Sequence, residues 1–448
     1  MIHKDRSRLA SGVLLLFALV LLFASTASAE WKEKVLYSFQ GGNDGFDPIG
    51  GIVSDKDGNL YGTTQAGGPP SCTPIGNYCG TVYELSPPVN QGDPWAKTQL
   101  YMFKGKKYND GESPDGLIID TAGNLYGVTA YGGTGGCVLL GVPAGCGTVY
   151  ELSPPKTRGG QWTYTILYSF KSGKDGYLPG GNLVFDGAGN LYGATYFGGG
   201  KGTTCNPYYQ YCGTIFELSP PKTKGGKWTE KVLYSFKGGT DGANPNGGLI
   251  LDSKGNVYGT TAWGGGTGCQ GPGCGTAFEL KPPTKTNGAW AEKIVHRFTD
   301  GSDGAGPDSG LIFDANGALY GTAVSGGSGN GFGVVFRLAQ AKQSGRWIET
   351  VLHSFQGGTD GRDPQGLVFD SLGHLYCSSG PIVRLKPPKQ KVGNWTLDVL
   401  YEFKGSPDGR SPLDLIFGAG GALYGTTLYG GTGQSCQGGC GTVFEAFP

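Results

Sequence analysis

The stretch WTEKVLYSF at residues 228–236 opens a unit that decides the fold. GGLILD (247–252), GNVYGTT (255–261) and GTAFELKPP (275–283) follow it. The first segment alternates apolar and polar side chains, and the others are short apolar runs bounded by Gly, Asp or Pro-Pro. Both features are typical of β-strands, and no helical period is present. The unit therefore predicts four antiparallel strands, named here D, A, B and C in chain order.

The unit recurs seven times, and each copy opens on a tryptophan. These are Trp31, Trp95, Trp162, Trp228, Trp290, Trp347 and Trp395. Seven repeats of four antiparallel strands predict an all-β fold, namely a seven-bladed β-propeller with one four-stranded sheet per blade. A β-solenoid is the alternative, although its coils are usually shorter and lack hairpins.

The phase of the repeat predicts how the ring closes. The first copy begins with an isolated D strand at 31–39, and the last copy ends on a C strand at 441–447. These two segments complete one blade between them. We therefore expect the N-terminal strand to complete the last blade and to remove the open edge of the array.

The N-terminus has the pattern of a signal peptide at residues 1–29. A basic start precedes the apolar stretch 13–23 and the small-residue sequence Ala27-Ser28-Ala29. We expect cleavage near Ala29, a single propeller domain at 30–448, and a secreted or periplasmic location. The alternative is an uncleaved N-terminal anchor. No second apolar run follows, so we expect no membrane span in the mature chain.

Composition limits the classes of function. The 35 Lys and Arg residues balance 35 Asp and Glu residues, which disfavours nucleic acid as a partner. The 87 glycines exclude a helical bundle, and 12% aromatic residues exclude a disordered chain. No nucleophile, P-loop or metalloprotease motif is present. We expect a monomer without a cofactor or a metal site.

Ten of the 11 cysteines fall in pairs within the loops between strands B and C. The pairs are Cys72/Cys79, Cys137/Cys146, Cys205/Cys212, Cys269/Cys274 and Cys436/Cys440. In an exported protein such pairs predict local disulfides. A metal site is the alternative, but it would need pairs that converge in space. Cys377 stands alone, and we expect it to be a buried thiol.

The recurrent segments VLYSF, GG-x-DG-x-x-P, GLIFD, GNLYGTT and GTVFEL resemble the GloVer (Gloeo-Verruco) tandem-repeat family of exported bacterial proteins. The resemblance covers residues 31–448 and involves several elements in every unit. It supports the propeller fold and export. It supplies no catalytic residues, so it leaves the function open.

Two sets of residues are candidates for binding. The first is the aspartate of each D-G-x-x-P turn, which either binds Ca²⁺ or accepts hydrogen bonds within its own turn. The second is an aromatic residue before Gly-Gly in four units: Tyr131, Phe197, Trp263 and Tyr429. Rings fixed on disulfide-bonded loops either stack on a sugar or pack on neighbouring loops.

Three functions follow as hypotheses. The favoured one is an exported cell-envelope or extracellular binding or scaffold protein that presents a propeller face to a saccharide or protein partner. The alternative is a metal-assisted lyase or hydrolase with a site in the propeller channel. Such a site would show as His, Glu or Asp residues that are specific to single units on the A strands. A purely structural surface protein is the third hypothesis.

Overall fold

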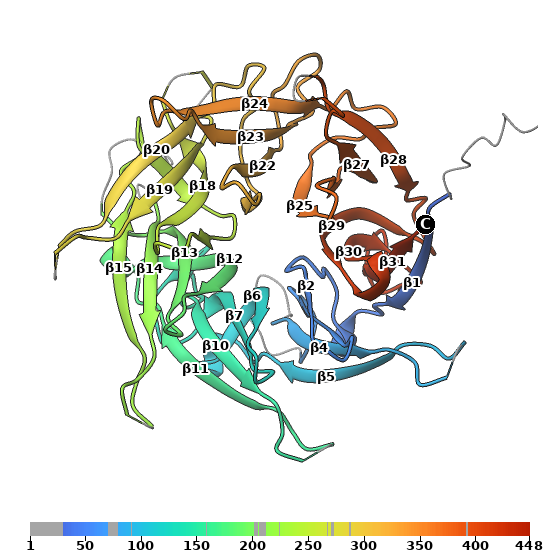
Figure 1. The fold of residues 1–448 in the computed structure, drawn as a ribbon. Coiled ribbons are helices and arrows are strands. Elements are labelled where there is room, and N and C mark those ends of the chain that lie inside the picture. The colour runs from blue at the N-terminus through green and yellow to red at the C-terminus, as the bar shows by residue number, and fades with distance from the viewer. Residues whose placement is uncertain are drawn as a thin grey trace, which may run out of the picture.

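The computed structural model describes residues 30–69, 79–90, 92–157, 159–200, 205, 212–223, 225–266, 268–269, 273–285, 288–390 and 393–448. Seven antiparallel sheets stand as blades around a central axis (Figure 1). The prediction of an all-β, seven-bladed propeller is confirmed. In each blade the A strand lies nearest the axis and the D strand forms the outer edge.

The strands of the blades are as follows. Blade 1 holds β2 (Ile52–Ser54), β3 (Leu60–Thr64), β4 (Thr81–Ser86) and β5 (Ala96–Met102), and blade 2 holds β6 (Gly111–Ile119), β7 (Leu125–Gly132), β10 (Thr148–Ser153) and β11 (Thr163–Ser169). Blade 3 holds β12 (Tyr177–Phe185), β13 (Leu191–Phe197), β14 (Thr214–Ser219) and β15 (Thr229–Ser235). Blade 4 holds β16 (Gly242–Pro245), β17 (Ile250–Leu251), β18 (Val257–Gly264), β19 (Thr276–Lys281) and β20 (Ala291–Arg297).

Blade 5 holds β21 (Ile312–Phe313), β22 (Leu319–Ala323), β23 (Val334–Gln340) and β24 (Trp347–Ser354), and blade 6 holds β25 (Gln365–Phe369), β26 (Leu375–Ser378), β27 (Pro381–Lys386) and β28 (Thr396–Glu402). Blade 7 holds β29 (Gly409–Phe417), β30 (Leu423–Gly430), β31 (Thr442–Phe447) and β1 (Lys32–Ser38). A small hairpin, β8 (Val138–Leu139) with β9 (Val142–Pro143), lies in the B–C loop of blade 2. Four short 3₁₀ turns are η1 (Gly42–Asp44), η2 (Lys106–Tyr108), η3 (Gly173–Asp175) and η4 (Ala419–Gly421).

The N-terminal strand closes the ring. β1 pairs antiparallel with β31, from Lys32 opposite Phe447 to Ser38 opposite Thr442. In Figure 1 the blue β1 lies beside the red β31 at the outer edge of the last blade. This confirms the predicted closure, in which the two ends of the chain share one sheet.

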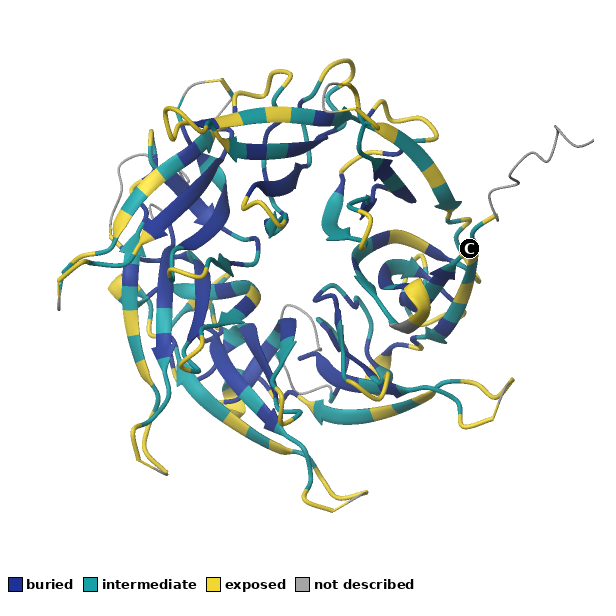
Figure 2. Ribbon diagram, viewed as in Figure 1, coloured by how far each residue is buried: buried dark blue, intermediate teal, exposed yellow. Residues whose placement is uncertain are grey.

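The seven repeated tryptophans lie between blades. Trp162 of blade 2 packs on Tyr61 of blade 1 with ring centroids 6.0 Å apart, and Trp31 packs on Tyr376 of blade 6 at 6.1 Å. The buried residues form seven core clusters, most of which combine residues of adjacent blades. In Figure 2 the middle strands of the blades are dark blue, whereas the outer strands alternate with exposed positions. The repeated Trp and Tyr therefore join the sheets into one ring.

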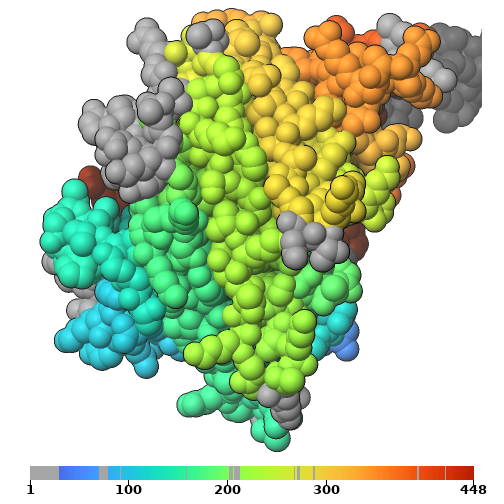
Figure 3. All heavy atoms as spheres, turned by 90° about the vertical axis from the view of Figure 1, so that its left-hand side faces the viewer, coloured from blue at the N-terminus to red at the C-terminus, as the bar shows by residue number. Residues whose placement is uncertain are grey.

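The two faces of the ring carry different connections. The A–B hairpins lie on one face, where Asp55 accepts the N–H groups of Asp57 and Asn59 and the Tyr61 hydroxyl. The D–A and B–C connections lie on the other face, which we call the upper face. Between the faces runs the outer wall, which Figure 3 shows on the side of β15 and β20.

Candidate functional site

The innermost strands are interrupted where they pass the axis. The pairing of β6 with β7 shifts register between Pro114 and Leu117, and the pairing of β29 with β30 shifts between Pro412 and Leu415. In blade 4 the same interruption separates β16 from β17. A β-bulge redirects side chains, so these interruptions turn residues of the A strands toward the axis.

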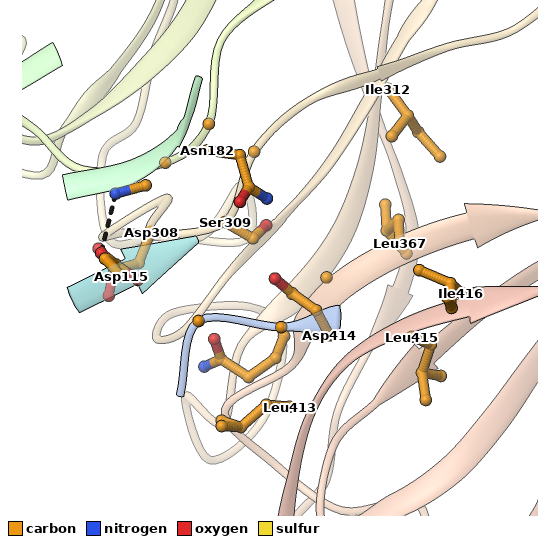
Figure 4. A pocket seen from close by; sticks show the side chains of 18 of the residues that line it. Asp115, Asn182, Asp308, Ser309, Ile312, Leu367, Leu413, Asp414, Leu415 and Ile416 are labelled. Atoms are coloured by element: carbon orange, nitrogen blue, oxygen red, sulfur yellow. Dashed lines mark hydrogen bonds between the residues drawn. The ribbon is translucent and has the colours of Figure 1, made fainter. Parts of the chain in front are cut away.

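The redirected residues line an axial channel of about 450 Å³. Hydrogen-bonding side chains enter it from every blade except the first. They are Asp115, Asn182, Asn246, Asp308, Ser309, Gln365 and Asp414. Figure 4 shows Asp115, Asp308 and Asp414 in the polar zone and Ile312, Leu367 and Ile416 in an apolar zone beside it. The channel thus combines convergent polar groups with apolar walls, as ligand sites usually do.

Asp115 is held by backbone N–H groups of two blades. Its Oδ1 accepts from its neighbour Gly116 at 2.9 Å. Its Oδ2 accepts from Gly181 of blade 3 at 2.9 Å, and this bond is the dashed line in Figure 4. Burial raises the pKa of the Asp115 carboxyl, and Asp308 raises it further, while the two N–H bonds oppose this rise. The carboxyl is therefore fixed in place, and its charged form is disfavoured by its surroundings.

A polar arc continues from Asp115 to Asp308. A Cβ atom on Gly180 would lie 3.4 Å from Asp115 Oδ2 and 3.5 Å from Asn246 Oδ1, so these two side chains flank the same glycine. Asn246 Nδ2 donates to Asp308 Oδ1 at 2.6 Å. The neighbouring Ser309 hydroxyl is buried and lies 2.5 Å from the Thr322 hydroxyl. These contacts fix the polar side chains of blades 2, 4 and 5.

Asp414 lies on the other side of the channel between two glycines. A Cβ atom on Gly51 would lie 3.4 Å from Asp414 Oδ2, and a Cβ atom on Gly366 would collide with Asp414 Oδ1. Burial raises the pKa of Asp414 to about 6, with a smaller contribution from Asp115. The side chain can therefore gain or lose a proton near neutral pH.

The channel carries acidic charge without an internal counter-ion. Its lining contains three aspartates and no Lys, Arg or His within the part of the chain that the structure describes. Enclosed carboxylates without a counter-charge favour ligands that donate hydrogen bonds or carry positive charge. In the same part of the chain, no group of three or more His, Cys, Asp or Glu side chains is placed to hold a metal ion.

The predicted aromatic residue Trp263 lies at the end of β18 on the upper face. Its indole Nε1 donates to the hydroxyl of Tyr196 in blade 3 at 3.3 Å, and the Trp263 side chain is half-buried. Asp308 of the channel contributes to the raised pKa of Tyr196, although burial is the larger cause. Trp263 and Tyr196 therefore form a pair of rings within electrostatic range of the channel.

The other three predicted aromatic residues lie on separate blades. Tyr131 is half-buried and pairs across the strands with Glu112. Phe197 is only 8% exposed and stacks on Tyr177. Tyr429 lies 5.1 Å beneath the guanidinium of Arg410 and lines a depression of about 410 Å³ between blades 7 and 1. Their role in ligand binding stays a prediction.

The repeated turn aspartates bond to groups of their own connections. Asp44 accepts the Tyr37 hydroxyl at 2.7 Å and the Gln40 N–H at 2.7 Å, and Asp408 accepts the Tyr401 hydroxyl and the Lys404 N–H in the same way. These contacts favour the turn interpretation of the D-G-x-x-P motif over a Ca²⁺ site.

Four of the five predicted disulfides are present: Cys137–Cys146, Cys205–Cys212, Cys269–Cys274 and Cys436–Cys440. Cys79 is also disulfide-bonded, but its predicted partner Cys72 lies outside the described residues. Cys377 is unpaired and buried, as predicted. The predicted signal peptide at 1–29 also lies outside the described residues. Within the described part of the chain, none of the helical segments has the length and apolar character to span a bilayer.

Sequence reasoning missed Asp115, Asp308 and Asp414. The signal was present, because the repeat positions of these aspartates vary between blades: the residue after the turn proline is Asp in blades 2 and 5 only, and the residue before the first apolar residue of the A strand is Asp in blade 7 only. Sister units carry Gly180 at the position of Asp115 and Gly248 at the position of Asp414. The sequence criterion for a channel site applies to the Gly-rich segment before each Leu-Ile or Leu-Val pair, where these aspartates lie.

Seven blades around a polar axial channel define a β-propeller with a central cavity. The chain belongs to the Gloeobacter/Verrucomicrobia repeat family, whose sequence profile matches residues 21–205 and 136–380. This confirms the family resemblance. No curated protein matches the sequence.

Two lyase structures have a similar fold. Streptogramin B lyase is 13% identical with a TM-score of 0.52, over 93% of this chain and 98% of that chain. A catalytically inactive virginiamycin B lyase from Staphylococcus aureus with quinupristin is 13% identical with a TM-score of 0.53, over 94% of this chain and all of that chain. At this identity the likeness shows the fold alone.

Proposed function

We propose that this chain is an exported binding protein that holds a saccharide at the upper mouth of its axial channel. The observation that carries the proposal is the convergence of hydrogen-bonding side chains from six blades on one cavity of about 450 Å³. A cavity of this size suits a ligand of one or a few sugar rings.

The chemistry of the lining matches that of a sugar. Sugar hydroxyls donate to carboxylates such as Asp308 and Asp414, and amides such as Asn182 and Gln365 both donate and accept. The apolar zone at Ile312 and Ile416 offers contact to the C–H groups of a ring. Trp263 adds a flat ring that contacts Tyr196, which itself interacts with Asp308, and this supports stacking at the mouth of the channel.

Export is supported by the four described disulfides, because disulfides persist in oxidising compartments. We place the protein in the periplasm or outside the cell after cleavage near Ala29. A protein partner that inserts a loop into the channel is the other outcome of the binding test below.

The test is a glycan array with the purified protein, followed by calorimetry on the best ligand. We expect Asp414→Ala to weaken binding at least tenfold. We expect Trp263→Ala to weaken it about fivefold, the equivalent of the ~1 kcal/mol that an aromatic contact contributes. Asp57→Asn, which changes an exposed carboxylate on the opposite face, is the matched control and should leave the affinity unchanged. Unchanged affinity in Asp414→Ala would contradict a channel site, and unchanged affinity in Trp263→Ala would remove Trp263 from it.

A lyase or hydrolase acting in the same channel is the second candidate function. It is favoured by Asp414, whose pKa of about 6 suits a general acid or base near neutral pH. The metal-assisted form would need a donor set that the described residues do not assemble. Turnover of an array ligand with an inflection near pH 6 that Asp414→Asn abolishes would support an enzyme. Binding without turnover would support the binding protein.

A further inference from the structure

The outer strands of neighbouring blades meet at a turn aspartate. At the junction of blades 7 and 1, Asp44 accepts the Tyr37 hydroxyl of β1. The same oxygen, Asp44 Oδ1, lies 2.7 Å from Lys97 Nζ of β5. The side chain of Lys97 is only 7% exposed. This ion pair therefore fastens the outer strand of one blade to that of the next.

Four other junctions have a glutamate where Lys97 stands. Each of these residues lies two positions after its repeated tryptophan, near the start of a D strand, and each interacts with the turn aspartate of its junction. The pairs are Glu33 with Asp408, Glu230 with Asp175, Glu292 with Asp241, and Glu349 with Asp303. Carboxyl groups of two blades therefore lie within electrostatic range of each other at four places around the ring.

The hydrogen bonding at these junctions is incomplete without a proton. Each of the four glutamates has a buried Oε1 atom that has no hydrogen-bond partner. Asp241 Oδ1 is also buried and has no hydrogen-bond partner. Two ionised carboxylates would repel each other and leave these oxygens unsatisfied. A proton on one oxygen converts it into a donor to the facing carboxylate.

The local contacts decide which partner holds the proton. Asp175 accepts the Tyr168 hydroxyl on Oδ1 at 2.6 Å and the Lys171 N–H on Oδ2 at 2.5 Å, so both of its oxygens already act as acceptors. Glu230 faces Asp175 from β15, which packs against η3. The proton therefore resides on the glutamate.

We propose that Glu33, Glu230, Glu292 and Glu349 are protonated in the folded ring and that each donates its proton to the facing aspartate across the blade boundary. The four carboxyl–carboxylate pairs form a pH-sensitive clasp: they hold adjacent blades together in acid and weaken as the pH rises.

Burial and the surrounding charges also favour the protonated form of the four glutamates. Burial, with the facing aspartate second, raises the pKa of Glu33 and of Glu230 to about 7. The pKa of Glu292 is also raised to about 7 by burial and Asp241, although Arg297 and Lys237 oppose the rise. For Glu349, burial and Asp303 outweigh His296 and raise the pKa to about 6.

The remaining groups at these junctions carry no opposing charge near neutral pH. They are the tyrosines that donate to or lie near the same carboxyls: Tyr401 beside Glu33, Tyr168 beside Glu230, and Tyr234 beside Glu292. Burial, and after it interaction with the carboxylates, raises their pKa values, so these tyrosines stay neutral. A glutamate pKa that is higher in the folded state than in the unfolded chain gives a stability that is complete below about pH 4.5 and is lost as the pH rises through 6 to 7.

The first experiment compares the purified chain with the variant E33Q/E230Q/E292Q/E349Q. Glutamine keeps a donor toward each aspartate at every pH. We expect the thermal midpoint of the native chain to fall by about 4 °C more than that of the variant between pH 5 and pH 8. Glu402→Gln, on an exposed outer-strand position, is the control and should follow the native chain. Equal pH dependence of the native chain and the quadruple variant would overturn the proposal.

The second experiment needs no variant and therefore holds even if the quadruple variant misfolds. Carboxyl ¹³C signals of glutamate-labelled protein are followed by NMR from pH 3 to pH 9. Four glutamates with midpoints between 6 and 7 are expected, and midpoints near 4.5 for all of them would overturn the clasp.

The third experiment separates a proton from a metal ion. E230K should place a Lys–Asp ion pair like Lys97–Asp44 at this junction. It should raise the thermal unfolding midpoint at pH 8 but not at pH 5. Calcium chloride is then added to the native chain and to the quadruple variant at pH 8. If it raises the thermal unfolding midpoint of the native chain only, a cation rather than a proton joins the carboxyls, and the proposal fails.

Discussion

Phe39 and Tyr83 meet edge to face, with ring centroids 5.1 Å apart, at the point where the first residues of the fold join the first blade. Phe39 directly follows β1, and Tyr83 lies in β4; both side chains are fully buried. The contact belongs to the core cluster that unites blades 7 and 1. The N-terminal strand therefore completes the last sheet and also fills the boundary with the next one.

Removal of residues 30–40 should destabilise the whole ring. The deletion exposes the edge of β31 and removes Phe39 from a closed core, for which a Phe→Ala change alone costs ~3–5 kcal/mol. We expect a lower thermal midpoint and aggregation, measured by calorimetry and size-exclusion chromatography. Leu372→Ala, at a site that is 75% exposed, is the control for a harmless change. A truncated chain that unfolds at the native midpoint would show that β1 does not stabilise the ring.

Lys97→Met should lower stability because it leaves Asp44 without its ion-pair partner. The pair is enclosed, so the loss of one member costs more than it would at the surface, and we expect ~2–3 kcal/mol. Chemical denaturation at pH 7 measures the change. Lys293→Met removes an exposed lysine from the equivalent region of β20 and should change the unfolding free energy by less than ~0.5 kcal/mol. Equal effects of the two substitutions would mean that the Lys97–Asp44 pair contributes nothing.

Asp414→Asn should stabilise the protein in alkaline solution and not in acid. Burial and Asp115 raise the folded-state pKa of Asp414 to about 6, so the carboxyl opposes folding increasingly as the pH rises from about 4, where the unfolded chain loses this proton, to about 6, and by a constant amount above that. We expect the gain to be ~1 kcal/mol or more larger at pH 8 than at pH 4, measured by denaturant unfolding at both values. A gain of the same size at both pH values would show that the channel does not perturb this group.

Cys377 should resist alkylation in the native protein. Its thiol is buried, and burial raises its pKa to about 12, so the reactive thiolate is scarce at pH 8. Mass spectrometry after iodoacetamide treatment should find Cys377 unmodified until a denaturant is added. Non-reducing peptide maps of the same sample should contain the four described disulfides and a bridge from Cys79 to Cys72. Labelling of Cys377 in the folded state, or a bridge between two blades, would contradict the structure.

The sequence by itself determined the blade count, the strand order and the closure of the ring. Trp31 and its six counterparts mark each unit, and the isolated strand at 31–39 can be completed only by 441–447. These features are readable because they depend on local alternation and on repetition. Cysteine pairs such as Cys436 and Cys440 were equally readable, because short sequence separation keeps them together.

Only the tertiary structure decided the site. Asp115, Asp308 and Asp414 lie far apart in the chain, and they converge because each A strand passes the axis and its bulges turn these side chains inward. The pairing of Trp263 with Tyr196 likewise depends on the contact between two blades. Repetition specifies what the units share, whereas a binding site arises from residues that differ between units, and closure of the ring alone brings those residues together.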